Sequence, residues 1–260
     1  MPDDEEDFDA PPPRDGDLDP SIDDPPVVGA DARRVYMDRF AEMDVDLRAT
    51  AAKEGDVLTM RALAYDPVPR VISALMENPN FSVNEARIIA REHKSGIGLQ
   101  MLTQRTRLLA DPEVRRRLLK NGHVSAQIIG TLLRGKPLLS IYQVGISHDV
   151  PENTKSFARA EMRRAFGERG ADEKVPLILK TDGRILTLVT GVPLDGRAIS
   201  MIIARTAMSP MLIRNFAQWP TTPPPILVHM LRLPQVSRDK SLQQAILRHP
   251  NVPSQYKRGT

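Results

Sequence analysis

Short turn motifs recur along most of the chain and divide it into segments that are each long enough for one short helix. Each motif joins a small polar residue or His, often with Pro, to an apolar residue and a Ser or Pro. Neighbouring motifs are about 11 to 16 residues apart, or about twice that, except across residues 151–206. Helices of about 9–11 residues are too short to be stable alone in water, so they must pack against their neighbours. Two such helices make a unit of roughly 25–30 residues, which is typical of helical-repeat proteins.

The clearest copies of this turn motif are Y-D-P-V-P from Tyr65, N-P-N-F-S from Asn78, A-D-P-E-V from Ala110, N-G-H-V-S from Asn121, S-H-D-V-P from Ser147, L-P-Q-V-S from Leu233 and H-P-N-V-P from His249. Looser copies are A-M-S-P ending at Pro210 and W-P-T-T-P from Trp219. Pro stops one helix and directs the next, because it lacks an N–H group and has a fixed φ angle.

The best-preserved copy runs from Tyr65 to Glu92 and predicts two capped helices. Asp66 is the expected N-cap of the first helix, with Pro67 at the first helical position. Ser82 is the expected N-cap of the second, and Glu85, three residues later, completes a capping box. Asn and Gly at the ends of helices favour a left-handed C-cap, which we expect at Asn78, Asn121 and Gly122.

Residues 66–90 resemble the leucine-rich repeat variant, a bacterial family related to HEAT-like repeats. Residues 111–133 resemble it more loosely, and residues 249–253 keep only the turn motif. The resemblance implies an all-α fold, a right-handed superhelical solenoid of short stacked helices with a binding surface, and it implies no reaction. The original member of that family carries an iron–sulfur cluster outside its repeats, but this chain has no Cys to hold one.

Composition narrows the class of protein. The chain is 41% hydrophobic but only 4% aromatic, so its core must be built mainly from aliphatic side chains. The absence of Cys excludes disulfides, thiolate catalysis and zinc–cysteine sites. No apolar run approaches the ~18 residues of a membrane helix, and the Met1 end has neither the basic nor the apolar part of a signal peptide. We therefore expect a cytoplasmic protein that does not associate with membranes.

The charges of the chain are divided unequally between a tail and a body. Residues 1–31 carry twelve acidic residues and one basic residue, whereas the remainder carries 35 Lys and Arg against 21 Asp and Glu. Residues 1–31 also contain seven prolines. A segment so charged and so poor in apolar residues cannot offset the entropy cost of ordering, so we expect it to be disordered. It is either a solubilising tail or an interaction tail that competes for the basic body.

The body is expected to have three parts. Residues 32–150 form a first helical-repeat block, which begins with helices at 32–53 and 57–64. Residues 151–205 interrupt the repeat with one longer helix over 151–167 and a connecting region. A strand pair of 175–180 with 185–190 is an alternative there, although helix is favoured by the helical surroundings. Residues 206–260 form a second repeat block.

Basic residues give the strongest functional signal in the body. Lys155, Arg159 and Arg163 recur every four residues on the expected long helix and would form one ridge, which Arg164 flanks. Two further basic groups lie on or beside neighbouring expected helices. The first is Arg115, Arg116, Arg117 and Lys120, and the second is Arg134 and Lys136. These basic residues have two possible interpretations: they form a solvated helix face, or they form a positive groove that binds phosphate or carboxylate groups.

The chain shows no convincing catalytic or metal-binding motif. Residues 130–137 fit the phosphate-loop spacing G-x-x-x-x-G-K, but they end in Pro where the loop needs Ser or Thr. None of the five His residues forms a metal-binding pair, and we expect His123, His148 and His249 to have structural roles in turns. Met201, Met208, Met211 and Met230 are expected to fill the core around Trp219, with a Met-lined protein groove as the alternative.

These observations predict a non-catalytic scaffold that binds another protein and needs no cofactor or metal. The alternative is binding of nucleic acid phosphates through the basic groove, with the acidic tail as a built-in competitor. A DNA repair enzyme on a HEAT-like scaffold is a third reading, and it would need Trp219 in the concave surface.

Overall fold

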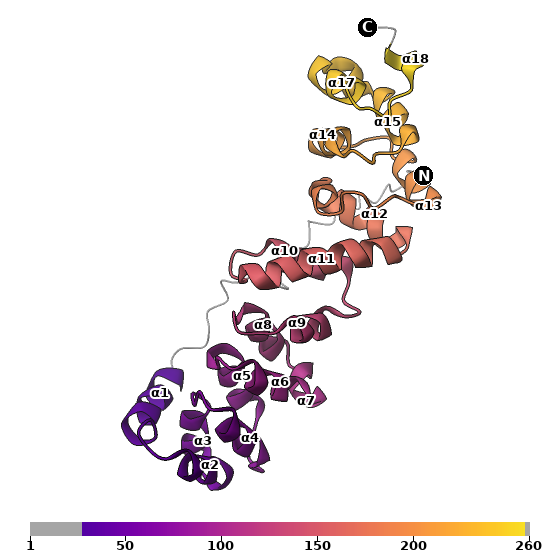
Figure 1. Ribbon diagram of the computed structural model, residues 1–260. Helices are drawn as coiled ribbons and strands as arrows, with labels where there is room; N and C mark the ends of the chain where they lie inside the picture. The colour runs from indigo at the N-terminus through magenta and orange to yellow at the C-terminus, as the bar shows by residue number, and fades with distance from the viewer. Residues whose placement is uncertain (1–27, 258–260) are drawn as a thin grey trace, which may run out of the picture.

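The computed structural model describes residues 28–257, and all regular structure in this range is helical. The helices follow one another along an elongated body, with α1 near one end and α18 at the other (Figure 1). Residues 1–27 of the expected disordered tail lie outside the described residues. The last part of residues 1–31 belongs to α1, which begins at Val28.

The first part of the body is a series of short helices: α1 (Val28–Arg39), α2 (Val45–Glu54), α3 (Val57–Leu63), α4 (Pro69–Glu77), α5 (Val83–Glu92), α6 (Gly96–Thr103), α7 (Thr106–Ala110), α8 (Pro112–Lys120), α9 (Ala126–Leu133) and α10 (Leu138–Ile146). The expected helix over 32–53 is wrong in extent, because the chain turns after α1 and Asp44 caps a new helix by accepting a hydrogen bond from the Asp46 N–H. The helix expected at 57–64 is confirmed as α3.

The second part contains the long helix α11 (Glu152–Glu168), which confirms the helix predicted over 151–167. It is followed by α12 (Ala171–Lys180), the 3₁₀ helix η1 (Arg184–Thr187), α13 (Gly196–Ile203), α14 (Pro210–Gln218), α15 (Pro224–Leu231), α16 (Pro234–Arg238), α17 (Lys240–Leu247) and α18 (Ser254–Lys257). Within residues 28–257 there is no strand, so the helical interpretation of 175–190 is correct.

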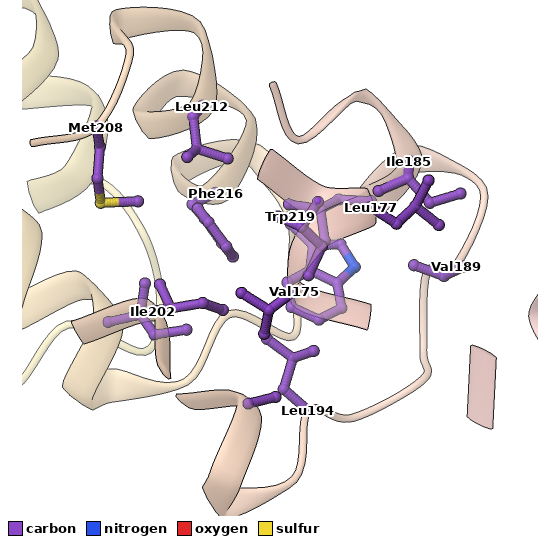
Figure 2. Packing of buried hydrophobic residues seen from close by; sticks show 14 of the residues in the cluster. Val175, Leu177, Ile185, Val189, Leu194, Ile202, Met208, Leu212, Phe216 and Trp219 are labelled. Carbon is purple, nitrogen blue, oxygen red and sulfur yellow. The ribbon is translucent and has the colours of Figure 1, made fainter. Parts of the chain in front are cut away.

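Buried apolar side chains form two clusters that meet where α10 packs on α11. The first cluster runs from Tyr36 to Ala158, and the second from Leu138 to Val252. Figure 2 shows part of the second cluster, in which aliphatic residues surround Phe216 and Trp219. This cluster joins residues of the 151–205 segment to residues of the 206–260 segment, so these two parts share one core.

The capping box at Ser82 is confirmed. The Ser82 hydroxyl accepts a hydrogen bond from the Asn84 N–H (3.2 Å), and the Glu85 carboxylate accepts one from the Ser82 N–H (3.0 Å). The expected cap at Asp66 is wrong, because α4 begins at Pro69 with Val68 as its N-cap. The Asp66 carboxylate instead accepts hydrogen bonds from Arg48 (2.7 Å) and from the Val68 N–H (2.8 Å).

The left-handed C-caps expected at Asn78 and Asn121 are also wrong, because both residues have extended backbone angles. Gly122 is not among the residues with positive φ either. The side chains of the two Asn residues bind the previous helix pair. The Asn78 Nδ2 donates to the carbonyl groups of Ala52 (3.1 Å) and Gly55 (3.0 Å).

The Asn121 side chain repeats this arrangement at the end of α8. Its Nδ2 donates to the carbonyl groups of Ala90 (3.0 Å) and His93 (2.9 Å), and its Oδ1 accepts from the His123 N–H (2.9 Å). Both Asn78 and Asn121 are buried. One side chain therefore satisfies carbonyl groups at the end of an earlier helix and also shapes the turn that follows it.

His249 takes the same role in the last turn motif. Its Nε2 lies 2.8 Å from the Trp219 carbonyl, and its Nδ1 accepts from the Asn251 N–H (3.1 Å). Because a carbonyl only accepts and an N–H only donates, the imidazole carries its hydrogen on Nε2. A neutral His thus supplies one donor and one acceptor in the way that Asn121 does, which explains why the motif starts with either residue. The expected structural role of His249 is confirmed, whereas His123 and His148 are exposed.

We predict that Asn121→Asp lowers the free energy of unfolding by more than about 2 kcal/mol, because a carboxylate would face carbonyl oxygens and leave them unpaired in a buried site. His249→Asn should cost less than His249→Ala, since Asn restores a donor and an acceptor. Urea unfolding of the four chains at pH 7 measures these differences. Equal losses for His249→Asn and His249→Ala would contradict the assigned role.

Candidate binding surface

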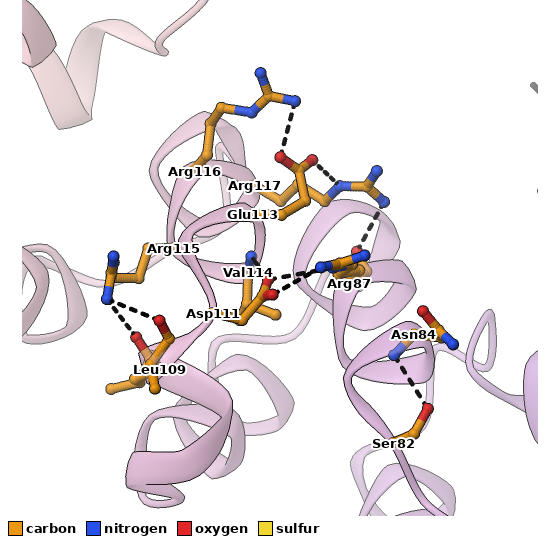
Figure 3. A network of polar contacts seen from close by, with 11 residues as sticks. Ser82, Asn84, Arg87, Leu109, Asp111, Glu113, Val114, Arg115, Arg116 and Arg117 are labelled. Carbon is orange, nitrogen blue, oxygen red and sulfur yellow. Dashed lines mark hydrogen bonds and ion pairs between the residues drawn. The ribbon is translucent and has the colours of Figure 1, made fainter. Parts of the chain in front are cut away.

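The basic residues of α8 are engaged in a local network (Figure 3). The Glu113 carboxylate pairs with Arg116 (2.8 Å) and Arg117 (2.5 Å), and Asp111 pairs with Arg87 of α5 (2.7 Å). Arg115 donates to the carbonyl of Leu109 (2.8 Å) at the end of α7. The side chains of Arg115, Arg116 and Arg117 are all half-buried.

The carboxylates of this network remain ionised. The hydrogen bond from Arg87 is the largest influence on Asp111 and holds its pKa below the usual range. Burial would raise the pKa of Glu113, but Arg117 and Arg116 outweigh burial, so the net direction is also downward. Three guanidinium groups thus face two carboxylates, so ion pairs within the chain offset part of the positive charge of α8.

The ridge expected on α11 is also compensated over most of its length. Glu152 pairs with Lys155 (3.1 Å) and Arg159 (2.9 Å), and Lys155 lowers the pKa of that carboxyl. Arg159 further donates to the Gly145 carbonyl (2.9 Å) and thereby joins α11 to α10. Arg164 pairs with Glu161 and Glu168, which raise its pKa.

The other candidates lie apart from one another. Lys120 pairs with Asp149 (3.3 Å) across the turn before α11. Arg134, Lys136 and Arg163 form no ion pair with any residue from 28 to 257, and of these Arg134 and Arg163 are exposed. Six of the ten candidates therefore have acidic partners within the chain, namely Arg116, Arg117, Lys120, Lys155, Arg159 and Arg164.

The surplus of basic over acidic residues is largest for its length in the C-terminal segment, residues 196–260. This segment has nine Lys and Arg residues and one acidic residue, Asp239, whereas residues 32–195 have 26 and 20. Six exposed cations form no ion pair within the described part of the chain, and we call them the C-terminal cations: Arg205, Arg214, Arg232, Arg238, Lys240 and Arg248. A charge count by segment would have found this surplus from the sequence.

Some of the C-terminal cations have a local structural role. Arg232 and Arg248 are the C-cap residues of α15 and α17. A cation at this position interacts favourably with the negative end of the helix dipole. This interaction is weak at exposed sites, about 0.3–1 kcal/mol, and leaves the charge open to a partner.

An open groove of about 490 Å³ is lined by one of these cations, Arg232. Its walls come from the end of α13, from α15 and from α18, and its lining residues are Ile203, Pro224, Pro225, Val228, His229, Arg232, Pro253, Gln255 and Tyr256. His229 Nε2 lies 2.8 Å from the Arg205 carbonyl, which holds the loop after α13 against α15. Arg232 donates to the Tyr256 hydroxyl (3.4 Å) at the rim. The groove is mainly apolar and contains no carboxylate.

A buried polar cluster at the other end of the body has a structural role. Arg48 donates to Asp66 (2.7 Å) and to the Tyr36 hydroxyl (3.0 Å), and His93 Nδ1 lies 3.1 Å from the Asp66 carbonyl. The Asp66 side chain is 0% exposed, and His93 is 2% exposed. A Cβ atom on Gly98 would lie 2.0 Å from His93 Nε2, so the imidazole packs directly on the α6 backbone. These contacts leave no room for a substrate and join α2, the turn before α4, and α6.

The remaining candidates have structural places as well. The segment from Gly130 to Pro137 begins within α9 rather than after a strand. Pro137, the N-cap of α10, has neither the hydroxyl nor the N–H group that a phosphate loop needs at that position, so the segment cannot form one. Trp219 is 2% exposed within the second core cluster, and Met208 and Met230 are also buried there. Met201 packs against the same cluster, while Met211 is 45% exposed. These methionines line no groove together.

Within residues 28–257, no three His, Cys, Asp or Glu side chains are grouped so that they could hold a metal ion. In the same range no helix is both long and apolar enough to cross a membrane. Comparisons of the chain with models of protein families, with curated proteins and with solved structures find no match. The functional argument must therefore come from the surface itself.

The His93 site predicts a pH dependence of stability. Burial is the main cause that lowers the pKa of His93 in the folded chain. Below the ordinary value of about 6.5, the unfolded chain binds a proton that the folded chain does not. The free energy of unfolding therefore decreases as the pH is lowered, by up to about 1.4 kcal/mol per pH unit. His93→Gln should remove this fall, because Gln cannot take up the proton. Urea unfolding between pH 7.5 and 5.5 gives both slopes.

Asp66 supplies an internal check on this prediction. Burial raises the pKa of Asp66 despite the Val68 N–H and Arg48, so its protonation favours the folded chain as the pH falls toward the ordinary value of about 3.9. Asp66 is present in both chains, so it contributes alike to both slopes. Parallel curves for the wild type and His93→Gln would therefore refute the role given to His93.

Proposed function

We propose that the protein is a non-catalytic helical-repeat scaffold that binds an acidic segment of another protein through its C-terminal segment. The observation that carries the proposal is the set of C-terminal cations, which have no acidic partners in residues 28–257. Such charges speed the encounter with an acidic partner and contribute specificity more than raw affinity. The proposal keeps the cytoplasmic location expected above and involves no cofactor.

The proposed architecture is a right-handed superhelical solenoid of the leucine-rich repeat variant or HEAT-like type. Its support is the hydrogen bonding of Asn78, Asn121 and His249, each of which reaches back to a carbonyl 23 to 31 residues earlier. A repeated link at this separation fits a unit of two short helices that contacts mainly its neighbours. Proteins of this kind present extended surfaces on which partners bind.

A protein partner is favoured over nucleic acid by the aromatic side chains. Single-stranded nucleic acids are held largely by stacking of bases on aromatic rings. In the C-terminal segment Phe216 and Trp219 are buried, and only Tyr256 is partly accessible. Contact with phosphates alone remains the second candidate function, because the cations can serve it. A repair enzyme receives no support, since Trp219 packs in the core.

A capture experiment separates the C-terminal surface from the basic residues predicted first. Two variants carry the same change in charge, Arg205→Glu with Arg248→Glu and Arg134→Glu with Arg163→Glu. In nuclease-treated extract of the native cells, we expect the first variant to retain about tenfold less acidic partner, equivalent to about 1.4 kcal/mol. The second should retain as much as the wild type, and quantitative mass spectrometry of the captured proteins measures both.

The matched variants make the result specific. Equal losses in both would mean that net charge alone governs capture, and equal retention would place the partner elsewhere. Either result contradicts the proposed surface. Circular dichroism of both variants confirms that the exposed substitutions leave the helices intact.

Nucleic acid binding makes a different prediction that salt titration can test. If all six C-terminal cations met phosphates, the logarithm of the affinity for random duplex DNA should fall against the logarithm of salt with a slope of about −5. Because we favour a protein partner, we expect little binding at physiological salt and a shallower slope. A slope near −5 that Arg205→Glu with Arg248→Glu reduces by about 2 would establish the second candidate instead.

A further inference from the structure

The groove formed by α13, α15 and α18 has an apolar floor and a polar rim. Ile203, Val228 and three prolines give it an apolar floor, while its rim carries Arg232 and the hydroxyl of Tyr256. Its volume of about 490 Å³ lies within the range of ~300–1,000 Å³ that is usual for ligand sites. Its occupant should therefore present an apolar side chain with acidic groups on both sides of it.

Two segments of the N-terminal tail have this pattern, one around Phe8 and one around Leu18, and Phe8 has the larger apolar side chain and more acidic neighbours. We infer that the groove binds residues 3–9 of the same chain, D-D-E-E-D-F-D, with Phe8 on the apolar floor and the neighbouring carboxylates near Arg232. Phe8 is the one aromatic residue in residues 1–27, and Asp7 and Asp9 flank it. No acidic residue lines the groove, so nothing within it would repel the segment.

Charge complementarity extends beyond the groove. Residues 1–31 have a net charge of −11, whereas residues 196–260 have a net charge of +8. Residues 32–195 have a net charge of +6 spread over a much longer stretch, and most of the basic candidates there already have acidic partners. The C-terminal segment is therefore the part of the body that an acidic tail would meet with the least competition from carboxylates of the chain.

The tail is long enough to reach the groove. Twenty residues separate Phe8 from Val28 at the start of α1. An extended chain covers about 3.3–3.6 Å per residue, so Phe8 can lie up to ~70 Å from α1. Packed helices are about 8–10 Å apart, and this reach therefore spans roughly seven layers. Helices that lie side by side, such as α10 and α11, share a layer, so this reach covers the body from α1 to α15 (Figure 1).

Docking of the tail would regulate the proposed scaffold. This inference deepens the proposed function, and its regulatory meaning rests on that function, although the docking itself needs no partner. A tethered segment has an effective concentration in the millimolar range, so a weak contact suffices to occupy the groove. An acidic partner must then displace the tail, which would exclude weak competitors.

Photo-crosslinking in the full chain tests this inference. Phe8 is replaced by the photo-crosslinker p-benzoylphenylalanine, and the purified protein is irradiated at low salt and at high salt. We expect crosslinks to residues 224–232 or 253–257, identified by mass spectrometry. Their yield should fall several-fold at 1 M salt, where the Debye length is about 3 Å.

Two matched variants locate the contact. Arg232→Glu removes a cation from the rim of the groove, and Arg214→Glu makes the same change in charge on α14, outside the groove lining. Arg232→Glu should lower the crosslink yield by about fivefold or more, and Arg214→Glu should leave it nearly unchanged, because screening limits exposed charges to short range. Equal effects would overturn a specific contact.

The remaining outcomes also decide the inference. Absence of crosslinks, or crosslinks to other helices, would overturn it. A mixture of ¹⁴N- and ¹⁵N-labelled chains shows whether a crosslink joins one chain or two, and links between chains would overturn docking within one chain. None of these results depends on capture of a partner. The proposed function could therefore fail in the capture experiment while tail docking holds, or the reverse.

Discussion

The hydrogen bonds from the turn motifs to the preceding helix pair are the interaction on which the array depends. Each short helix ends with carbonyl groups that have no partner within the helix. A buried side chain with donors placed beside several of these groups satisfies them and at the same time fixes the spacing of two layers. Asn121 does this with one amide nitrogen, and His249 does it with one imidazole nitrogen. Short helices that could not stand alone thereby become parts of one body.

Local features of this fold could be read from the sequence, and distant partners could not. The capping box of Ser82 and Glu85 is visible because its members are three residues apart. The partners of Asn78 lie 23 and 26 residues earlier, and the partner of Asp66, Arg48, lies 18 residues earlier. The sequence therefore suggested local caps for both residues. In the structure they are buried and make tertiary contacts.

The candidate site shows the same division. The candidate binding residues were clusters of Arg and Lys with a high local density of positive charge. The density of acidic residues around a cluster matters as much, because it decides how much of that charge is left for a partner. Glu113 and Glu152 lie within one or two turns of the cations that they pair with, so this compensation was readable from helical spacing. Asp149, the partner of Lys120, lies 29 residues away, so this ion pair could not be predicted from helical spacing. The surplus of basic residues in the C-terminal segment could be found by counting both basic and acidic residues in each segment.

The separation of charge has a consequence for how the molecule can use it. At physiological ionic strength the Debye length is about 8 Å, so a tail and a surface tens of ångströms apart hardly attract each other. Net charge alone thus cannot hold residues 1–31 on the body or choose between acidic partners. The choice must come from short-range contacts, and the groove of α13, α15 and α18 is where apolar walls and cations occur together. An acidic segment without an apolar side chain would meet the same cations but gain nothing from the floor.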